Sequence, residues 1–179
     1  MNRIALLLYV SFIGLTLNAQ SDKLINWMSF QEAIEASENE NKKFFIDIYT
    51  DWCGWCKKMD RSTFSNPVIA ELINKYYFPV KLDAEMTDRV LLNGNVFVNE
   101  HPDKRRNPHQ LAIALLNGKM SYPSTVYLDE KGNMLQPIPG YQDPKSIEPI
   151  LIFFGTNEHL KEGANWEKFE QNFKSKLEQ

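Results

Sequence analysis

Cysteine and histidine are both scarce in this chain. The 179 residues include two cysteines and three histidines. The histidines (His101, His109 and His159) lack the paired spacing of a metal site, whereas structural zinc takes four cysteine or histidine ligands. A zinc site is therefore disfavoured, and the sequence predicts no metal and no cofactor.

A strong charge of one sign is also missing. The formal net charge is -3, charged residues make up 24% and hydrophobic residues 43%, which is ordinary for a globular domain. No basic stretch with interleaved aromatic residues is present, and this is the usual signature of a nucleic-acid interface. A nucleic-acid partner is therefore not expected.

The longest apolar run, Ile4–Leu17, is shorter than the roughly 20 residues that a membrane-spanning helix needs. It follows the positively charged start Met1-Asn2-Arg3 and precedes a suitable signal-peptidase site at Leu17-Asn18-Ala19. We therefore predict a signal peptide over residues 1–19 and one exported domain, periplasmic or secreted, over residues 20–179. An uncleaved membrane anchor is the alternative interpretation.

Both cysteines lie in one stretch, Lys43–Met59, which reads KFFIDIYTDWCGWCKKM. The apolar run Phe44–Tyr49 predicts a strand, and Cys53 and Cys56 stand where this strand gives way to a predicted helix. A C-x-x-C pair at such a junction favours dithiol–disulfide chemistry. A purely structural bridge is less attractive, because a disulfide that closes so small a loop stabilises the fold weakly.

The remaining pattern predicts strands and helices around this junction. The expected strands are Leu24–Trp27 at an edge, Phe44–Tyr49 in the centre and covered on both faces, Tyr77–Leu82, and a hairpin of Thr125–Leu128 and Met134–Ile138. The first expected helix begins with a capping box at Ser29 and Glu32, and the second begins at the cysteines and pauses near Asp60–Ser65. The later expected helices begin at Asn66-Pro67, at Asp143-Pro144 and at about Asn165, and Leu111–Leu116 form a further helix. We therefore expect an α/β fold, with a central mixed sheet flanked by helices on both faces.

The segment Ala84–Ser121 is the least regular part of the sequence. Val90–Leu92 fits a short helix, Asn93-Gly94-Asn95 predicts a turn, and His101–Asn107 is a charged loop that contains Arg105-Arg106. A solvated loop is the simpler interpretation of these arginines, and docking of a partner is the alternative.

With this element order, the chain resembles the thioredoxin superfamily from Leu24 to Phe154. The resemblance rests on Trp52–Lys57 (WCGWCK), on Asp47 in the preceding strand, on Tyr122-Pro123 before the hairpin, and on Gly140 after it. The run DWCGWCKKMDRSTFSNPVI is most similar to exported thioredoxin-like proteins and to the C-terminal domain of the membrane thiol:disulfide interchange protein. The resemblance implies a thioredoxin fold with an insertion before a cis-proline and an extra C-terminal helix.

Three residues are candidates for the chemistry itself. Cys53 stands at a helix N-terminus, where backbone N–H groups stabilise a thiolate, so we expect it to be the attacking nucleophile. Cys56, one turn later, would resolve the mixed disulfide. Asp47 is either an outward-facing side chain of an edge strand or, as the resemblance implies, a buried carboxylate that accepts the proton of Cys56.

The other candidate residues concern substrate binding. The resemblance implies a cis bond before Pro123 that presents backbone to an extended substrate, whereas a trans-proline at the start of a strand is the alternative. Trp52, Trp55 and Tyr122 are expected to contact the substrate, although Trp52 fits packing support equally well.

The expected activity is thiol:disulfide exchange with disulfide-containing protein substrates. The resemblance favours reduction, with a membrane thiol:disulfide transporter as the electron donor. Trp55 occupies the place of thioredoxin's proline, which leaves the direction of exchange open. A disulfide isomerase or oxidase, or a non-catalytic binding module of the same fold, are the alternatives.

Overall fold

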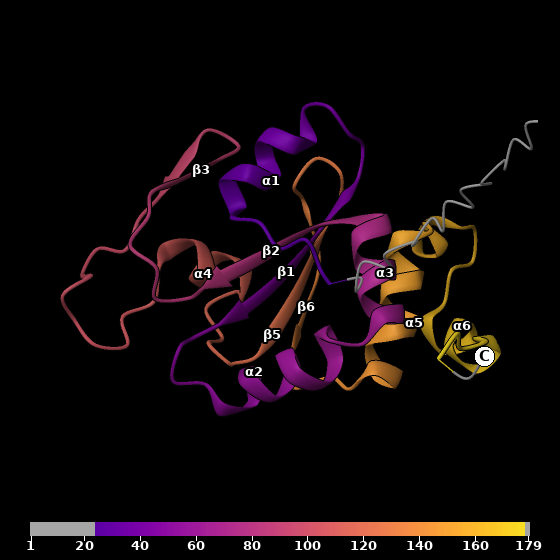
Figure 1. Cartoon of the computed structure of the whole chain (residues 1–179). Helices are drawn as coiled ribbons and strands as arrows, with labels where there is room; N and C mark the ends of the chain where they lie inside the picture. Colours follow the sequence, from indigo (N-terminus) through magenta and orange to yellow (C-terminus); the bar gives the residue numbers. More distant parts are fainter. Residues whose placement is uncertain (1–23, 178–179) are drawn as a thin grey trace, which may run out of the picture.

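The computed structural model describes residues 24–177, which are built around a four-stranded sheet (Figure 1). The predicted signal peptide lies outside the described residues. The elements are α1 (Phe30–Ser37), β1 (Lys43–Tyr49), α2 (Gly54–Met59), the π-helical turn η1 (Asp60–Phe64), α3 (Pro67–Tyr76), β2 (Tyr77–Asp83), β3 (Val90–Leu92), β4 (Asn95–Phe97), α4 (Gln110–Leu115), β5 (Ser124–Leu128), β6 (Met134–Pro139), α5 (Pro144–Gly155), the 3-10 turn η2 (Glu158–Leu160) and α6 (Trp166–Asn172).

The main sheet is mixed, as predicted. Its strand order is β2-β1-β5-β6; β1 runs parallel to β2 and antiparallel to β5, and β5 pairs with β6 as an antiparallel hairpin. Strand β1 is central, and its first six residues are all buried. A strand that is covered on both faces reads as a continuous apolar run, which explains the sequence KFFIDIY.

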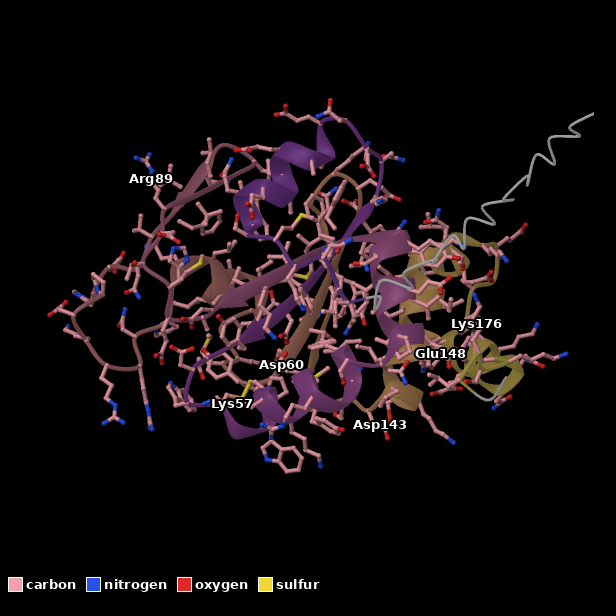
Figure 2. The ribbon with its side chains drawn as sticks, in the orientation of Figure 1. Lys57, Asp60, Arg89, Asp143, Glu148 and Lys176 are labelled. Carbon is pink, nitrogen blue, oxygen red and sulfur yellow. A yellow bond between two sulfur atoms is a disulfide. The ribbon has the colours of Figure 1, made fainter. Side chains whose placement is uncertain are left out.

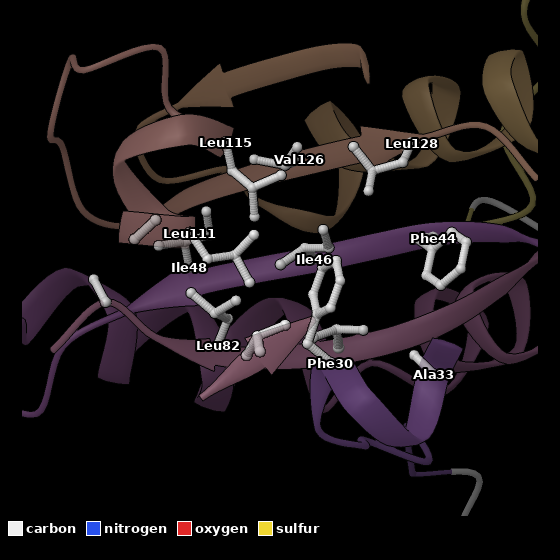
Figure 3. Packing of buried hydrophobic residues seen from close by; sticks show 14 of the residues in the cluster. Phe30, Ala33, Phe44, Ile46, Ile48, Leu82, Leu111, Leu115, Val126 and Leu128 are labelled. Carbon is white, nitrogen blue, oxygen red and sulfur yellow. The ribbon is translucent and has the colours of Figure 1, made fainter. Parts of the chain in front are cut away.

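Alternation along β1 divides the core into two clusters. Phe44, Ile46 and Ile48 point to the face covered by α1 and α4 (Figure 3), whereas Phe45 points to the face covered by α2, η1, α3 and α5. Successive side chains of a strand leave on opposite faces. Asp47 is therefore on the same face as Phe45, beneath the helix that carries the cysteines.

The predicted edge strand at Leu24–Trp27 is not formed. Met28, the residue directly after this segment, forms an isolated parallel bridge with Val80 of β2. The side chain of Asn74 in α3 accepts a hydrogen bond from the backbone N–H of Asn26 and donates one to the carbonyl of Leu24, both at 2.9 Å. The backbone groups of this segment thus pair with a helix side chain instead of a strand.

The predicted helix at Val90–Leu92 is also wrong. These residues form β3, which pairs with β4 through the predicted turn. Asn93 and Gly94 have φ angles of 49° and 75°, and two positive φ values in a row are typical of the tight turns that favour hairpins. The hairpin turn at Asn93-Gly94 therefore determines the conformation of Val90–Leu92, and the helical propensity of these three residues does not.

The helix that follows the cysteines continues where a pause was predicted. After α2 it widens into the π-helical turn η1, and Asn66 then caps α3 by accepting hydrogen bonds from Val68 and Ile69. The Thr63 hydroxyl donates to the carbonyl of Gln142 at 2.6 Å, which ties this turn to the loop before α5. The predicted cap at Asn66 is confirmed.

The C-terminal helix α6 packs against α5 of the same domain. The rings of Trp166 and Phe169 lie 5.2 and 5.0 Å from the ring of Phe153 in α5. Between residues 24 and 177, no helix has both the length and the apolar character required to cross a bilayer.

Candidate active site

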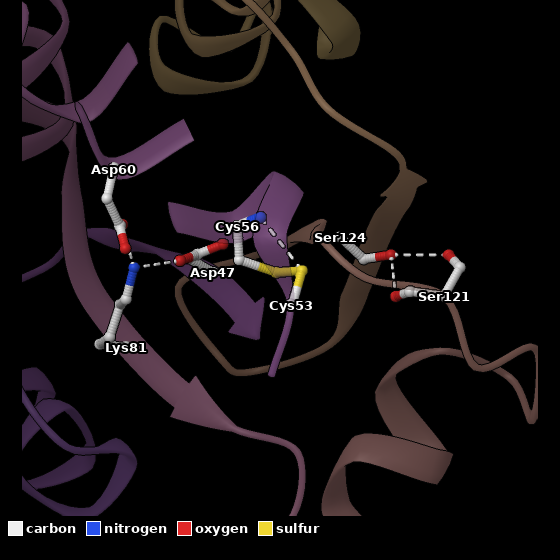
Figure 4. The surroundings of a disulfide bond; sticks show 7 residues. All are labelled: Asp47, Cys53, Cys56, Asp60, Lys81, Ser121 and Ser124. Carbon is white, nitrogen blue, oxygen red and sulfur yellow. Dashed lines mark hydrogen bonds and ion pairs between the residues drawn. A yellow bond between two sulfur atoms is a disulfide. The ribbon is translucent and has the colours of Figure 1, made fainter. Parts of the chain in front are cut away.

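Cys53 and Cys56 form a disulfide at the start of α2, with an S–S distance of 2.03 Å (Figure 4). The backbone turns there because the N–H of Cys53 donates to the carbonyl of Thr50 at 3.0 Å, and Cys53 then serves as the N-cap of α2. In this disulfide form the residues are 5% and 2% exposed, respectively. Cys56 is thus the deeper of the two.

The cap geometry distinguishes the two sulfur atoms. The Sγ atom of Cys53 accepts the backbone N–H of Cys56 at 3.0 Å. Unpaired N–H groups and the helix dipole both favour negative charge at this end of a helix. A thiolate on Cys53 would therefore be stabilised by an interaction that is already in place, whereas Cys56 lies inside the first turn.

Asp47 is buried behind the disulfide, and its side chain points toward Cys56 (Figure 4). Burial raises its pKa to about 6, an effect that the nearby Lys81 partly offsets. Its Oδ2 atom accepts a hydrogen bond from Lys81 Nζ at 2.6 Å, whereas Oδ1 is buried without a hydrogen-bond partner. A carboxyl group with a pKa near neutrality and a free oxygen can exchange a proton with its surroundings.

The pairing of β1 with β2 sets Lys81 directly beside Asp47. Lys81 also forms an ion pair with Asp60 in η1. Burial would lower the pKa of Lys81, but these two carboxylates raise it above its ordinary value. Sequence reasoning missed Lys81, although a lysine inside the apolar strand YFPVKLD is the kind of signal that marks a buried charge pair.

The peptide bond before Pro123 is cis, as the resemblance implied. Its loop is fixed on both sides, because Ser124 Oγ donates to the carbonyl of Ser121 at 2.8 Å and the N–H of Gly140 donates to the carbonyl of Pro123 at the same distance. In Figure 4 the loop of Ser121 and Ser124 lies on the Cys53 side of the disulfide, opposite Asp47.

Trp52 is 48% exposed and is held by three contacts. Its ring lies edge-on to Tyr122, with the centroids 5.8 Å apart, and its Nε1–H donates to Glu85 at 2.9 Å. The guanidinium of Arg106 covers the ring at 4.6 Å from the centroid. Trp52 and Tyr122 thus belong to one cluster next to Cys53. Glu85 and Arg106 are also part of this cluster, and neither was predicted as a site residue.

Trp55 stands apart from that cluster and is 57% exposed. Its ring centroid lies 5.5 Å from that of Tyr141, and Lys58 Nζ lies 4.6 Å from the Trp55 ring and 4.9 Å from the Tyr141 ring. Tyr141 was not predicted, because it approaches the cysteines only through the fold. The C-x-x-C motif is therefore flanked by one exposed ring from each group, Trp52 beside Tyr122 and Trp55 beside Tyr141.

The four-stranded sheet, the C-x-x-C disulfide at a helix start and the cis-proline loop define a protein of the thioredoxin-fold class. Residues 14–149 match the family described as "Thioredox_DsbH: Protein of unknown function, DUF255". The chain belongs to this family, and it is related to the thiol:disulfide interchange protein DsbD.

Similar proteins include an uncharacterized protein and two DsbD proteins. An uncharacterized protein of Archaeoglobus fulgidus is 39% identical over 75 residues, which are 42% of this chain and 59% of that protein. DsbD of Photorhabdus laumondii is 24% identical over 158 residues, 84% of this chain and 22% of the relative. DsbD of Escherichia coli K12 is 26% identical over 123 residues, 66% and 18% of the two chains. The chain thus spans only part of the length of these relatives.

Solved structures agree on the fold. A thioredoxin-fold protein from Helicobacter pylori superposes with a TM-score of 0.55 at 15% identity, over 86% of this chain and 91% of that one. A thioredoxin from Thermus thermophilus gives a TM-score of 0.51 at 13% identity, over 71% and 84% of the two chains.

Proposed function

We propose that this protein is an exported thiol:disulfide oxidoreductase that reduces disulfides in protein substrates through Cys53 and Cys56. The observation that carries the proposal is the position of Cys53 as the N-cap of α2, with its Sγ atom accepting the N–H of Cys56. A helix N-terminus lowers the pKa of a cysteine thiol and so supplies the thiolate that disulfide exchange requires.

The first step is the attack of the Cys53 thiolate on one sulfur of a substrate disulfide. The substrate S–S bond breaks, a mixed disulfide forms, and the other substrate sulfur leaves as a thiolate. In this proposal an extended substrate segment lies along the loop of cis-Pro123, next to Cys53. Trp52, Tyr122 and Trp55 supply apolar contact area around that segment.

In the second step Cys56 attacks the Sγ atom of Cys53 and releases the substrate as a dithiol. Cys56 must lose its proton to become a nucleophile, and Asp47 is the buried base toward which that proton can move. The free Oδ1 atom and the pKa of about 6 support this role. The two electrons that reduce the substrate come from the dithiol, which ends as the Cys53–Cys56 disulfide.

A dithiol donor must then reduce this disulfide for another cycle. The relationship to DsbD, named for thiol:disulfide interchange, supports a membrane thiol:disulfide transporter as that donor. The signal-like residues 1–19 support a periplasmic or secreted location, where disulfide substrates persist.

Trapping of the mixed disulfide tests the mechanism. In Cys56→Ser the second step is blocked, so Cys53-linked adducts with a disulfide-containing protein are expected to accumulate on non-reducing gels. Cys53→Ser is the matched control and should form none. If Cys56→Ser forms no adducts while Cys53 reacts with a thiol reagent, a non-catalytic binding module explains the fold better.

Equilibration with glutathione buffers tests the direction of exchange. A reduction potential near thioredoxin's, about -270 mV, is expected for a reductant. A potential near that of DsbA, about -120 mV, or of protein disulfide isomerase, about -180 mV, would contradict the reductant role and favour an oxidase or an isomerase.

A further inference from the structure

The segment between β2 and β5 reaches the rim of the disulfide site through Trp52. Glu85 at its start accepts the indole N–H, and Arg106 covers the indole ring. Asn99, which is 9% exposed, ties the two together: its Nδ2 atom donates to the carbonyl of Asn107 at 3.0 Å and lies 3.4 Å from that of Glu85. The arginine loop is exposed, as expected, but Asn99 anchors it next to Trp52.

Arg106 is exposed and has a φ angle of 59°. Among residues 24–177, no carboxylate forms an ion pair with it. A guanidinium that stacks on an aromatic ring still presents its N–H donors at its edge, in a fork that matches a carboxylate. Arg106 thus lies over the Trp52 ring as an exposed cation that has no ion-pair partner among the described residues.

Lys58 repeats this arrangement beside Trp55. Its ammonium group lies over the rings of both Trp55 and Tyr141, and within the described chain no acidic side chain pairs with it either. A cationic side chain therefore lies over each of the two tryptophans of the motif, Trp52 and Trp55. These cations are available to a ligand that binds across the cysteines.

We propose that the rim formed by Arg106 on Trp52 and Lys58 on Trp55 selects acidic polypeptide segments, with Asp or Glu side chains next to the disulfide that is reduced. This inference rests on the proposed function, because it names the substrate class of the same site. Aromatic rings cover the neighbouring backbone of the substrate, while the two cations pair with its carboxylates. Complementary charges at the rim of an interface act chiefly by accelerating association.

The test compares two disulfide-bridged peptides that differ only in having Asp or Asn on either side of their cysteines. The fully reduced protein is mixed with each peptide, and the second-order rate constant is followed by tryptophan fluorescence. We expect the Asp peptide to react about fivefold to tenfold faster at about 0.01 M salt, and the ratio to approach one at about 1 M salt. Arg106→Gln is expected to lower the ratio to about twofold.

Arg105→Gln is the matched control, since it removes the same charge from the adjacent exposed position without touching Trp52, and its ratio should stay near that of the unaltered protein. An equal loss in both variants, or equal rates for both peptides with the unaltered protein, overturns the inference and leaves the proposed function intact. Failure to reduce either peptide, and also the uncharged hydroxyethyl disulfide, overturns the proposed function itself. The salt dependence of the unaltered protein decides the matter if Arg106→Gln does not fold.

Discussion

Asp47 is the residue at which stability and the proposed chemistry conflict. Its carboxyl group lies on an otherwise apolar face with a single cationic partner, and burying a charge without full compensation is costly. The rise in its pKa from 3.8 to about 6 corresponds to about 3 kcal/mol, since each pKa unit is worth about 1.36 kcal/mol. Such strain is typical of functional residues.

Replacing Asp47 should therefore stabilise the oxidised protein. Because the folded-state pKa is raised, the folded form binds this proton more tightly than the unfolded form, and stability falls as pH rises from about 3.8 to about 6. We expect Asp47→Asn to gain about 1 to 3 kcal/mol above pH 6, the loss of the Lys81 pair limiting the gain, and nothing below pH 3.8. Urea unfolding across this pH range measures the difference; a gain that does not depend on pH would contradict the assignment.

The same substitution should slow release of the mixed disulfide by about 10- to 100-fold, because the proton acceptor for Cys56 is lost. In the unaltered protein this rate is expected to rise through pH 6 as Asp47 ionises, and in Asp47→Asn that rise should disappear. Rapid-quench measurements of mixed-disulfide decay give both profiles. A merely structural role of Asp47 would leave the shape of the pH profile unchanged.

At the level of elements, the position of α5 against α3 depends on close backbone approach. A Cβ atom added at Gly155, the last residue of α5, would lie 2.9 Å from the Cβ and Cγ atoms of Tyr76. The hydroxyl of Tyr77, the first residue of β2 and the one directly after α3, donates to the carbonyl of Leu151 in α5 at 2.6 Å and holds α5 at this place. Small size at position 155 is therefore a packing requirement.

Gly155→Ala is expected to destabilise the protein by about 1 to 3 kcal/mol through overpacking. Gly54→Ala is the matched control, since a Cβ there would meet nothing within 4 Å, and it should not destabilise. Denaturant unfolding of the oxidised proteins gives both values. Equal stability of Gly155→Ala and the unaltered protein would mean that the helices shift without cost.

At the scale of the whole molecule, Glu148 ties the C-terminal end of the described chain to the domain. It is completely buried in α5 and accepts hydrogen bonds from the Ser175 hydroxyl at 2.5 Å and the Lys176 N–H at 2.7 Å. Figure 2 shows Glu148 and Lys176 together where the chain returns past α6. The chain end is thus part of the tertiary structure.

Glu148→Ala should lower stability by about 1 to 3 kcal/mol, because it removes the hydrogen bonds that the Ser175 hydroxyl and the Lys176 N–H donate to a buried carboxylate. Hydrogen exchange at the Lys176 amide should accelerate, since its hydrogen bond is lost. Glu158→Ala is the control, because Glu158 pairs only with the exposed Lys161 and surface pairs contribute roughly 0 to 1 kcal/mol. An unchanged exchange rate at Lys176 in Glu148→Ala would show that the tail is held by other contacts.

Local sequence patterns were sufficient to predict an element wherever interactions among neighbouring residues determine its conformation. The apolar run of β1, the capping box of Ser29 and the Asn93-Gly94 turn all act within a few residues, so the sequence predicted them. The C-x-x-C pair was equally visible, because two lone cysteines at a strand–helix junction suggest few other roles. Leu24–Trp27 and Val90–Leu92 were mispredicted, because side-chain partners and strand pairing elsewhere decide such short runs.

The sequence by itself determined that Cys53 and Cys56 stand as a C-x-x-C pair where a strand gives way to a helix, that the sheet is mixed, and that an acid, Asp47, lies in its central strand. Only the tertiary structure decided which residues surround that chemistry. Lys81 reaches Asp47 through the register of two strands, and Arg106 reaches Trp52, which is far from it in the sequence, through a loop that Asn99 anchors. Such contacts depend on the packing of the whole domain, because no local spacing in the sequence brings these residues together.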